Sequence, residues 1–251
     1  MPRNWTEPEI EKAIELYAVT PFGRMHSRNP SIIKLAEELD RTSGSVALKL
    51  TNLASIDETL DRKGMSNASN LDRVVWKRFF DGLLALGRDT EIPLTTDTTD
   101  AFSEAEQSEY LPAATGPTSS LRMINARNKQ NFFRRMIISN YDQKCAVTGI
   151  SQPELLVAGH IRPWSTDPEN RLNPRNGICL NRVHDRAFEE KLIAINADGT
   201  IEYSRRLEPT AKQKLMELSD TGRFSFPTKF KPDPAFLAEH YEAFNARELA
   251  S

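Results

Sequence analysis

Apolar residues recur at helical spacing in four stretches of residues 1–88. Thr6 can cap the first helix, in which Pro8 would take an early position that suits proline. Asn29-Pro30 and a turn at residues 40–43 precede the second and third, and a fourth is predicted from about Leu71 to Leu86. The apolar positions are Ile10, Ala13, Ile14 and Tyr17; Ile32, Ile33, Leu35, Ala36 and Leu39; Val46, Leu48, Leu50 and Leu53; and Val74, Val75, Phe79, Leu83 and Leu86.

The second and third predicted helices are joined by the short polar turn Asp40-Arg41-Thr42-Ser43, which is the arrangement of a helix-turn-helix. In that arrangement Ser45 and Lys49 would face a DNA groove, together with Thr42 and Ser43. A plain helical bundle explains the same pattern, because no residue type in it is specific to DNA. The region is therefore expected to bind DNA or to act as a sensor.

The pattern changes after residue 121. A helix with a buried side at Phe132 and Phe133 is followed by short apolar runs that predict strands at 155–158 and 177–180 and a helix at 183–190. Two more runs, at 192–195 and 200–203, flank Asp198-Gly199 and predict a hairpin. Helices are expected again at 211–218 and 234–244. Helices followed by a mixed region predict an α+β fold.

Charge divides the chain further. Residues 89–109 contain seven acids and no Lys or Arg, whereas residues 122–144 contain six bases and one acid. The acidic stretch is rich in Thr and Ser and lacks apolar periodicity, so it predicts a flexible linker. We therefore expect a helical domain at 1–88, a linker at 89–120 and a third region at 121–251. Arg134 and Arg135, on the polar side of the basic helix, are candidates for contact with phosphate.

Composition excludes some classes of protein. The chain is 39% hydrophobic and 27% charged with a formal net charge of −2, as in soluble globular proteins. No apolar run approaches the roughly 20 residues that span a bilayer, and the first residues lack the apolar core of a secretory signal. With only Cys145 and Cys179, a reduced cytoplasmic protein fits better than a disulfide scaffold. No membrane association is expected.

Three polar residues stand out in the third region: His160, Asn176 and His184, two of the chain's four histidines with an asparagine between them. The surrounding residues follow the pattern His-Ile-x-Pro-Trp, then Asn-Gly, then His-Asp-x-x-Phe. From about Cys145 to Ile195 this pattern resembles the HNH endonucleases, and within them the restriction and phage-defence members. The resemblance implies a ββα unit that holds one divalent metal ion against a phosphodiester of double-stranded DNA.

The resemblance also assigns roles to these residues. His160, at the end of a strand, would be the general base that activates water. Asn176 would orient the His160 ring from the adjacent strand. His184 and Asp185, at the start of the helix, would be the metal ligands, and imidazole with carboxylate suits Mg²⁺, Mn²⁺ or Zn²⁺. His26 and His240 have no suitable partner residues near them in the sequence and are expected to be structural.

Two positions depart from the wider family. Many members carry a metal-ligating acid immediately before the first histidine, where this chain has Gly159. Many also have a zinc knuckle of paired cysteines, which two cysteines cannot form; Asn181 stands about where another cysteine would be. Apolar packing and hydrogen bonds must then hold the ββα unit together.

Several alternatives remain open on the sequence. Arg162 and Arg182 are predicted to hold DNA phosphates, although arginines near this site can equally pair with neighbouring acids. The chain is expected to be a metal-dependent endonuclease, and a homodimer is compatible with this expectation because cutting both strands of a duplex often uses two sites. The alternatives are a DNA-binding regulator with an inactive nuclease domain and a nuclease activated by a partner or ligand.

Overall fold

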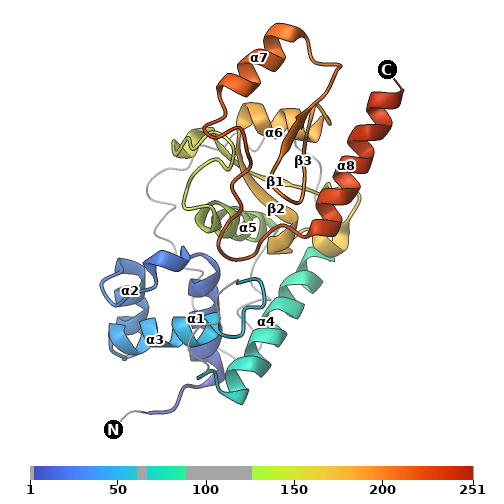
Figure 1. The fold of residues 1–251 in the computed structure, drawn as a ribbon. Coiled ribbons are helices and arrows are strands. Elements are labelled where there is room, and N and C mark those ends of the chain that lie inside the picture. The colour runs from blue at the N-terminus through green and yellow to red at the C-terminus, as the bar shows by residue number, and fades with distance from the viewer. Residues whose placement is uncertain (1–2, 61–66, 89–125, 251) are drawn as a thin grey trace.

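The computed structural model describes residues 3–60, 67–88 and 126–250. A group of helices from the first third of the chain packs against a second group of elements that contains two small antiparallel sheets (Figure 1). This mixture confirms the predicted α+β fold. The predicted linker at 89–120 lies outside the described residues. None of the described helices is long and apolar enough to cross a membrane.

The four N-terminal helices form where the apolar spacing predicts them. Their bounds are Glu7–Ala18 (α1), Pro30–Glu38 (α2), Ser43–Ala54 (α3) and Asn70–Arg88 (α4). The starts are capped by side chains. The Glu9 carboxylate accepts from the backbone N–H of Thr6 at 2.8 Å, and the side chains of Asn29 and Thr42 accept from backbone N–H groups at the starts of α2 and α3.

The core of this region is built on α1. Ile10, Ile14 and Tyr17 are fully buried, and the Tyr17 hydroxyl donates to Asp57 at 2.6 Å. Three residues of the predicted apolar stripes, Ile33, Leu48 and Val74, are instead exposed, because they lie beside the buried face of their helices rather than on it. The remaining stripe residues carry the packing of α1 against α3 and α4.

Lys49 corrects part of the helix-turn-helix prediction. Its side chain is buried, and its ammonium group forms an ion pair with Asp72 at 2.7 Å. Asp72 also accepts from the backbone N–H of Ser69 at the start of α4. Lys49 therefore joins α3 to α4 and does not face a groove, since the buried carboxylate of α4 holds its charge inside the helical region.

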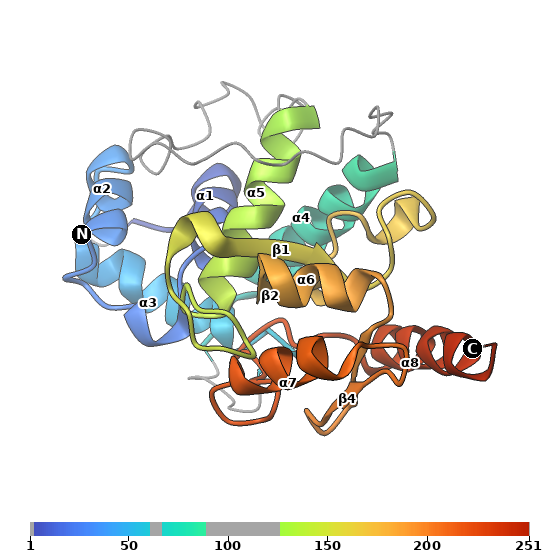
Figure 2. The same cartoon turned by 90° about the horizontal axis from the view of Figure 1, so that it is seen from above.

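The next elements form a ββα unit. Strands Leu156–His160 (β1) and Gly177–Asn181 (β2) pair antiparallel, with His160 opposite Gly177. Helix Arg182–Glu189 (α6) lies on one face of this pair, and the basic helix Ala126–Asn140 (α5) lies on the other (Figure 2). Successive strand residues point to opposite faces, so neighbouring residues of β1 face different helices.

The rest of the chain supports this unit. A hairpin of Ile193–Ile195 (β3) and Ile201–Tyr203 (β4) follows, and then helices Pro209–Glu217 (α7) and Pro234–Leu249 (α8). The ring of His240 on α8 stacks on Phe188 of α6 at 3.6 Å, and its Nε2 lies 2.9 Å from the Phe188 carbonyl oxygen. His240 therefore attaches α8 to α6.

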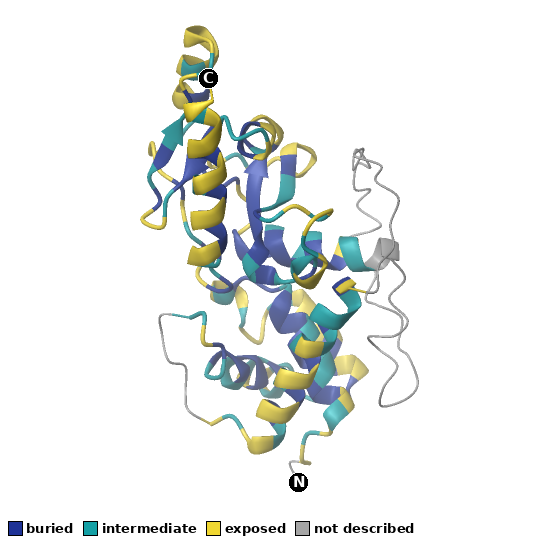
Figure 3. Cartoon of the chain, turned by 90° about the vertical axis from the view of Figure 1, so that its right-hand side faces the viewer, coloured by how far each residue is buried: buried dark blue, intermediate teal, exposed yellow. Residues whose placement is uncertain are grey.

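Both regions share one hydrophobic core. Buried residues continue from the N-terminal helices into the ββα unit (Figure 3). The buried ammonium of Lys229 donates to the carbonyl groups of Tyr17 and Ala18 at the end of α1, and the Phe230 backbone N–H donates to the Thr59 hydroxyl at 2.6 Å. Division at residue 88 into independent domains stays a prediction. The contacts show that the described parts pack together closely.

Lys49→Met should lower the free energy of unfolding by about 3 kcal/mol, because it leaves the Asp72 carboxylate buried without its counter-charge. Lys77→Met is a matched control: Lys77 forms an exposed ion pair with Asp81, and its loss should cost less than about 0.5 kcal/mol. Urea unfolding followed by circular dichroism measures both. Equal stability of the two variants would contradict a structural role for Lys49.

Candidate active site

His160 lies at the end of β1 on the face covered by α5. Its ring stacks on Phe133 at 4.3 Å with an interplanar angle of 8°, and Trp164 contacts it edge-on at 5.4 Å. The Nε2 atom lies 2.9 Å from the carbonyl oxygen of Arg171. Because a carbonyl oxygen only accepts, Nε2 carries the hydrogen and Nδ1 is the unprotonated nitrogen. Burial lowers the pKa of His160 to about 4, so the ring is neutral near pH 7.

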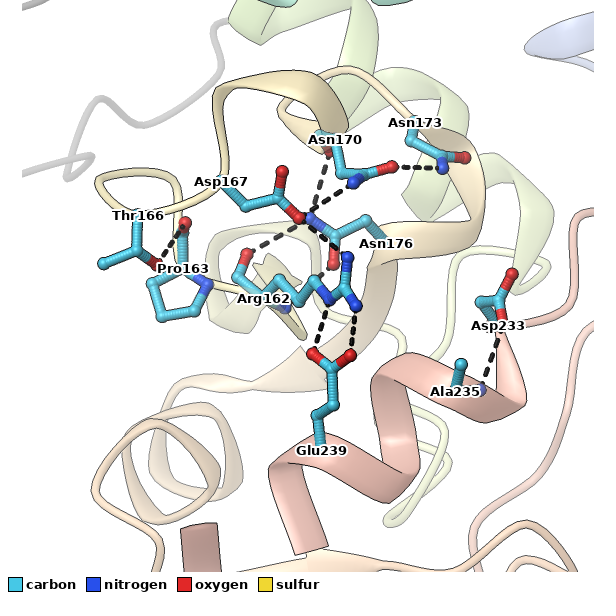
Figure 4. Close-up of polar contacts among 10 residues, drawn as sticks. All are labelled: Arg162, Pro163, Thr166, Asp167, Asn170, Asn173, Asn176, Asp233, Ala235 and Glu239. Atoms are coloured by element: carbon cyan, nitrogen blue, oxygen red, sulfur yellow. Dashed lines mark hydrogen bonds and ion pairs between the residues drawn. The ribbon is translucent and has the colours of Figure 1, made fainter. Parts of the chain in front are cut away.

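Asn176 does not contact the His160 ring. Its buried amide accepts from the backbone N–H of Arg162 at 2.8 Å and donates to the carbonyl groups of Arg162 and Asn170 at 3.1 and 3.0 Å (Figure 4). The orienting partner expected from Asn176 is supplied by the Arg171 carbonyl instead. Asn176 lies beneath the loop between the strands, so the backbone of that loop is its nearest partner. It acts on His160 indirectly, by holding this loop.

Arg162 is held by acidic partners. Its guanidinium donates to Glu239 of α8 at 2.7 Å and to Asp167 at 3.1 Å, and it lies over the Phe236 ring (Figure 4). The hydrogen bond to Glu239 raises the pKa of Arg162 further. These contacts fasten the loop to α8 and offset the positive charge that was predicted to hold DNA.

Asp185 lies on the other face of β1. A Cβ atom added to Gly159 would come within 2.3 Å of the Asp185 Oδ1 atom, so the carboxylate occupies the space of the missing side chain. Burial raises the pKa of Asp185 to about 6, with Arg182 and Arg186 acting in the opposite direction. Gly159 and His160 are adjacent, with Cα atoms about 3.8 Å apart. The acid absent at 159 is thus replaced in space by an acid from α6.

His184 points elsewhere and is fully buried. Its Nδ1 atom lies 3.2 Å from the Asn181 side-chain oxygen, which also accepts from the His184 backbone N–H. The Cys145 sulfur accepts from the backbone N–H groups of Asn181 and Thr148, and the Asn181 amide donates to the Thr148 hydroxyl. This hydrogen-bonded cluster supports the start of α6, as expected in the absence of a zinc knuckle.

The Asp185 carboxylate fits a metal ion. A carboxylate beside a glycine suits Mg²⁺ or Mn²⁺, and Mg²⁺ commonly takes one or two protein carboxylates with the remaining positions left to water and substrate phosphate. The Nδ1 atom of His184 faces Asn181 inside the cluster, whereas its Nε2 atom is buried with no hydrogen-bond partner among the described residues, so a role as metal ligand stays a prediction for His184. Within the described ranges no group of three or more His, Cys, Asp or Glu side chains converges on one point.

The predicted phosphate contacts differ in their exposure. Arg134 donates to the carbonyl groups of Pro153 and Leu156, and burial lowers its pKa, so it supports the start of β1. Arg182 is exposed, and its Nε donates to the Glu154 carbonyl at 3.1 Å beside the candidate site. Ser45 and Arg135 are partly exposed. The residue that sequence reasoning missed is Arg171, because its contribution is a backbone carbonyl and carries no signal in residue type.

Residues 145–196 match the family model described as HNH endonuclease. The match covers the ββα unit and contains His160, Asn176, His184 and Asp185. None of the curated proteins matches the chain. The matched segment supports nuclease activity, and HNH nucleases generally use divalent metal ions.

Two glycines in the strand pair should respond differently to substitution. Gly177→Ala places a Cβ atom within 2.4 Å of Ile137 in the core, and we expect a loss of about 1–3 kcal/mol of stability through overpacking. Gly159→Ala meets only the end of the Asp185 side chain, which can turn aside, so stability should stay within about 0.5 kcal/mol. Thermal and urea unfolding test the pair, and a large loss in Gly159→Ala would contradict this arrangement.

Proposed function

We propose that this chain, which carries an HNH endonuclease domain at residues 145–196, is a metal-dependent endonuclease that hydrolyses phosphodiester bonds of double-stranded DNA. The observation that carries the proposal is the state of His160. One ring nitrogen is held by the Arg171 carbonyl, which leaves Nδ1 as a basic nitrogen one residue away from the Gly159–Asp185 contact. His160 and the Gly159–Asp185 contact thus lie at the same end of β1, on opposite faces of the strand pair.

The proposed reaction is an in-line attack of water on phosphorus. The Nδ1 atom of His160 accepts the proton of the attacking water, while the Arg171 carbonyl keeps the ring in the required tautomer. The bond from phosphorus to the leaving oxygen breaks, and that oxygen takes a proton from solvent. A divalent ion held by Asp185 would stabilise negative charge on the phosphate and on the leaving oxygen.

Burial and substrate act in opposite directions on the base. A pKa of about 4 keeps His160 unprotonated and ready to accept a proton at neutral pH. A bound phosphodiester places negative charge near the ring and raises the pKa of His160, since an opposite charge favours the protonated form. Proton affinity therefore increases when substrate is present.

The wider setting follows from the sequence pattern. We place the chain in restriction or phage defence, with residues 1–88 as a DNA-binding or sensor domain joined by a linker at 89–120 to a nuclease domain at 121–251. A homodimer would bring two sites to the two strands of a duplex. A regulator with an inactive nuclease domain is the competing function, and cleavage assays separate the two.

Plasmid DNA incubated with the protein should be cut in the presence of Mg²⁺ or Mn²⁺ and left intact with EDTA. His160→Ala should lower the cleavage rate about 10²- to 10⁴-fold, the usual contribution of a general base. Asp185→Asn should also abolish stimulation by the metal, and Gly159→Ala should weaken it because the added Cβ displaces the carboxylate.

The matched control is Glu189→Gln, an exposed acid one turn along the same helix that pairs with Arg186. It should retain the wild-type rate, and all variants should retain DNA binding in a gel-shift assay. Full cleavage by His160→Ala would overturn the assignment of the base. Absence of cleavage by the wild type under all metals would favour the inactive regulator.

A salt titration of DNA binding in EDTA tests the arginine contacts. Arg182→Ala should reduce the slope of log affinity against log salt concentration by about 1, because an exposed phosphate contact releases about one counterion. Arg162→Ala should leave the slope unchanged, since Glu239 and Asp167 already pair with its charge. The reverse result would show that Arg162 exchanges its acidic partners for phosphate when DNA binds.

A further inference from the structure

A second concave site lies away from His160 and Asp185. A cavity of about 670 Å³ separates α1 and the segment 20–34 from α5 and the start of β1. This volume lies within the roughly 300–1,000 Å³ typical of small-molecule sites. The proposed nuclease chemistry does not use it.

The lining of the cavity is strongly basic. Its described lining contains five Lys or Arg residues and a histidine but one acid, Glu15; the bases are Arg24, Arg28, Lys34, Arg134 and Arg135, and the histidine is His26. Arg24 and Arg28 are exposed, and their guanidinium groups make no hydrogen bond or ion pair with other described residues. The N-terminal end of α2 also opens here, at Asn29 and Pro30. This set of positive charges and the helix N-terminus favour the binding of an anion.

The lining of the cavity also contains apolar residues. They are Leu16 of α1, Val19 directly after α1, Phe132 and Ile138 of α5, and Leu156 of β1. An inorganic anion alone would leave this apolar surface uncovered. A ligand with a flat apolar part and a charged part would cover both kinds of lining residue.

We infer that this cavity binds a nucleoside phosphate, with the phosphate at Arg24 and Arg28 and the nucleobase against the apolar floor. The inference goes beyond the proposed cleavage reaction, because it concerns a separate site and a different readout. The nucleoside phosphate could be a free nucleotide or the end of a single DNA strand, since both present the same chemistry. Duplex DNA fits less well, because its bases are stacked inside the helix and cannot cover an apolar floor.

Glu15 fits an anion site despite its charge. Burial raises the pKa of its carboxyl to about 7; Glu11 and Glu38 add to this effect, and Lys12 and Arg135 oppose it. The carboxyl makes no hydrogen bond or ion pair with other residues of the described chain. At pH 8 it is mainly ionised and would repel a phosphate, so Glu15→Gln should tighten binding at that pH.

The direct test is equilibrium binding of the fluorescent nucleotide N-methylanthraniloyl-ADP to the full chain in EDTA, followed by anisotropy. The double variant Arg24→Ala, Arg28→Ala should bind at least about tenfold more weakly, since a charge-assisted hydrogen bond contributes about 1.5–3 kcal/mol. The double variant Lys77→Ala, Arg205→Ala removes the same charge from exposed positions outside the cavity and should bind like the wild type.

Competition identifies the source of the ligand. Displacement of the probe by unlabelled ADP alone supports a free nucleotide, and displacement by a short single-stranded oligonucleotide supports a strand end. Wild-type affinity in the Arg24→Ala, Arg28→Ala variant would overturn the inference, as would an absence of probe binding at millimolar concentration.

Plasmid cleavage by the same variant separates this inference from the proposed function. Without nucleotide, it should cut at the wild-type rate. If the variant instead lost cleavage and salt-dependent binding of duplex DNA while probe binding stayed unchanged, Arg24 and Arg28 would be contacts for duplex DNA. That result would overturn the inference. A wild-type protein that binds the probe but cuts no DNA would contradict the proposed nuclease function alone.

Discussion

Three hydrogen bonds from the buried Asn176 amide hold the loop on which the candidate site depends. They tie the backbone of Arg162 and Asn170 to the residue that precedes β2. Arg171 is the residue after Asn170 in the same loop, so its backbone is held in place as well. The Arg171 carbonyl then selects the tautomer of His160. The Asn176 side chain thereby helps to determine which nitrogen of the His160 ring is unprotonated, because its three hydrogen bonds hold the loop that carries the Arg171 carbonyl.

The strand pair separates the His160 ring from the Asp185 carboxylate. Gly177 lets α5 approach one face, where Phe133 stacks on His160, and Gly159 lets the Asp185 carboxylate approach the other. Removal of a side chain at 159 does not remove the acid, since α6 supplies it. The His160 ring and the Asp185 carboxylate therefore lie on opposite faces of the strand pair, and burial keeps the pKa of His160 low.

The helical region reaches this site directly. The end of α4 packs on the loop: the Arg171 guanidinium donates to the Gly87 carbonyl, and Arg88 pairs with Glu169 at 2.8 Å. Lys229 and Phe230 fasten the opposite side to α1 and Thr59. The basic cavity lies between α1, α2 and α5, and α5 carries the Phe133 ring that covers His160. Occupation of that cavity would thus act on elements that support the base.

Local patterns in the sequence determined the elements and much of their chemistry. Apolar spacing and caps at Thr6 and Asn29 predicted the helices. Short apolar runs predicted the strands, and Asp198-Gly199 predicted the hairpin. The order of His160, Asn176 and His184 predicted the HNH domain. These features depend on residues close together in the chain. Only the tertiary structure decided which partner each polar group takes: Asp72 for Lys49, Glu239 for Arg162, the Arg171 carbonyl for His160 and Asn181 for His184. Those choices depend on which backbone and side-chain groups become neighbours after long-range packing, and residue type alone does not encode them.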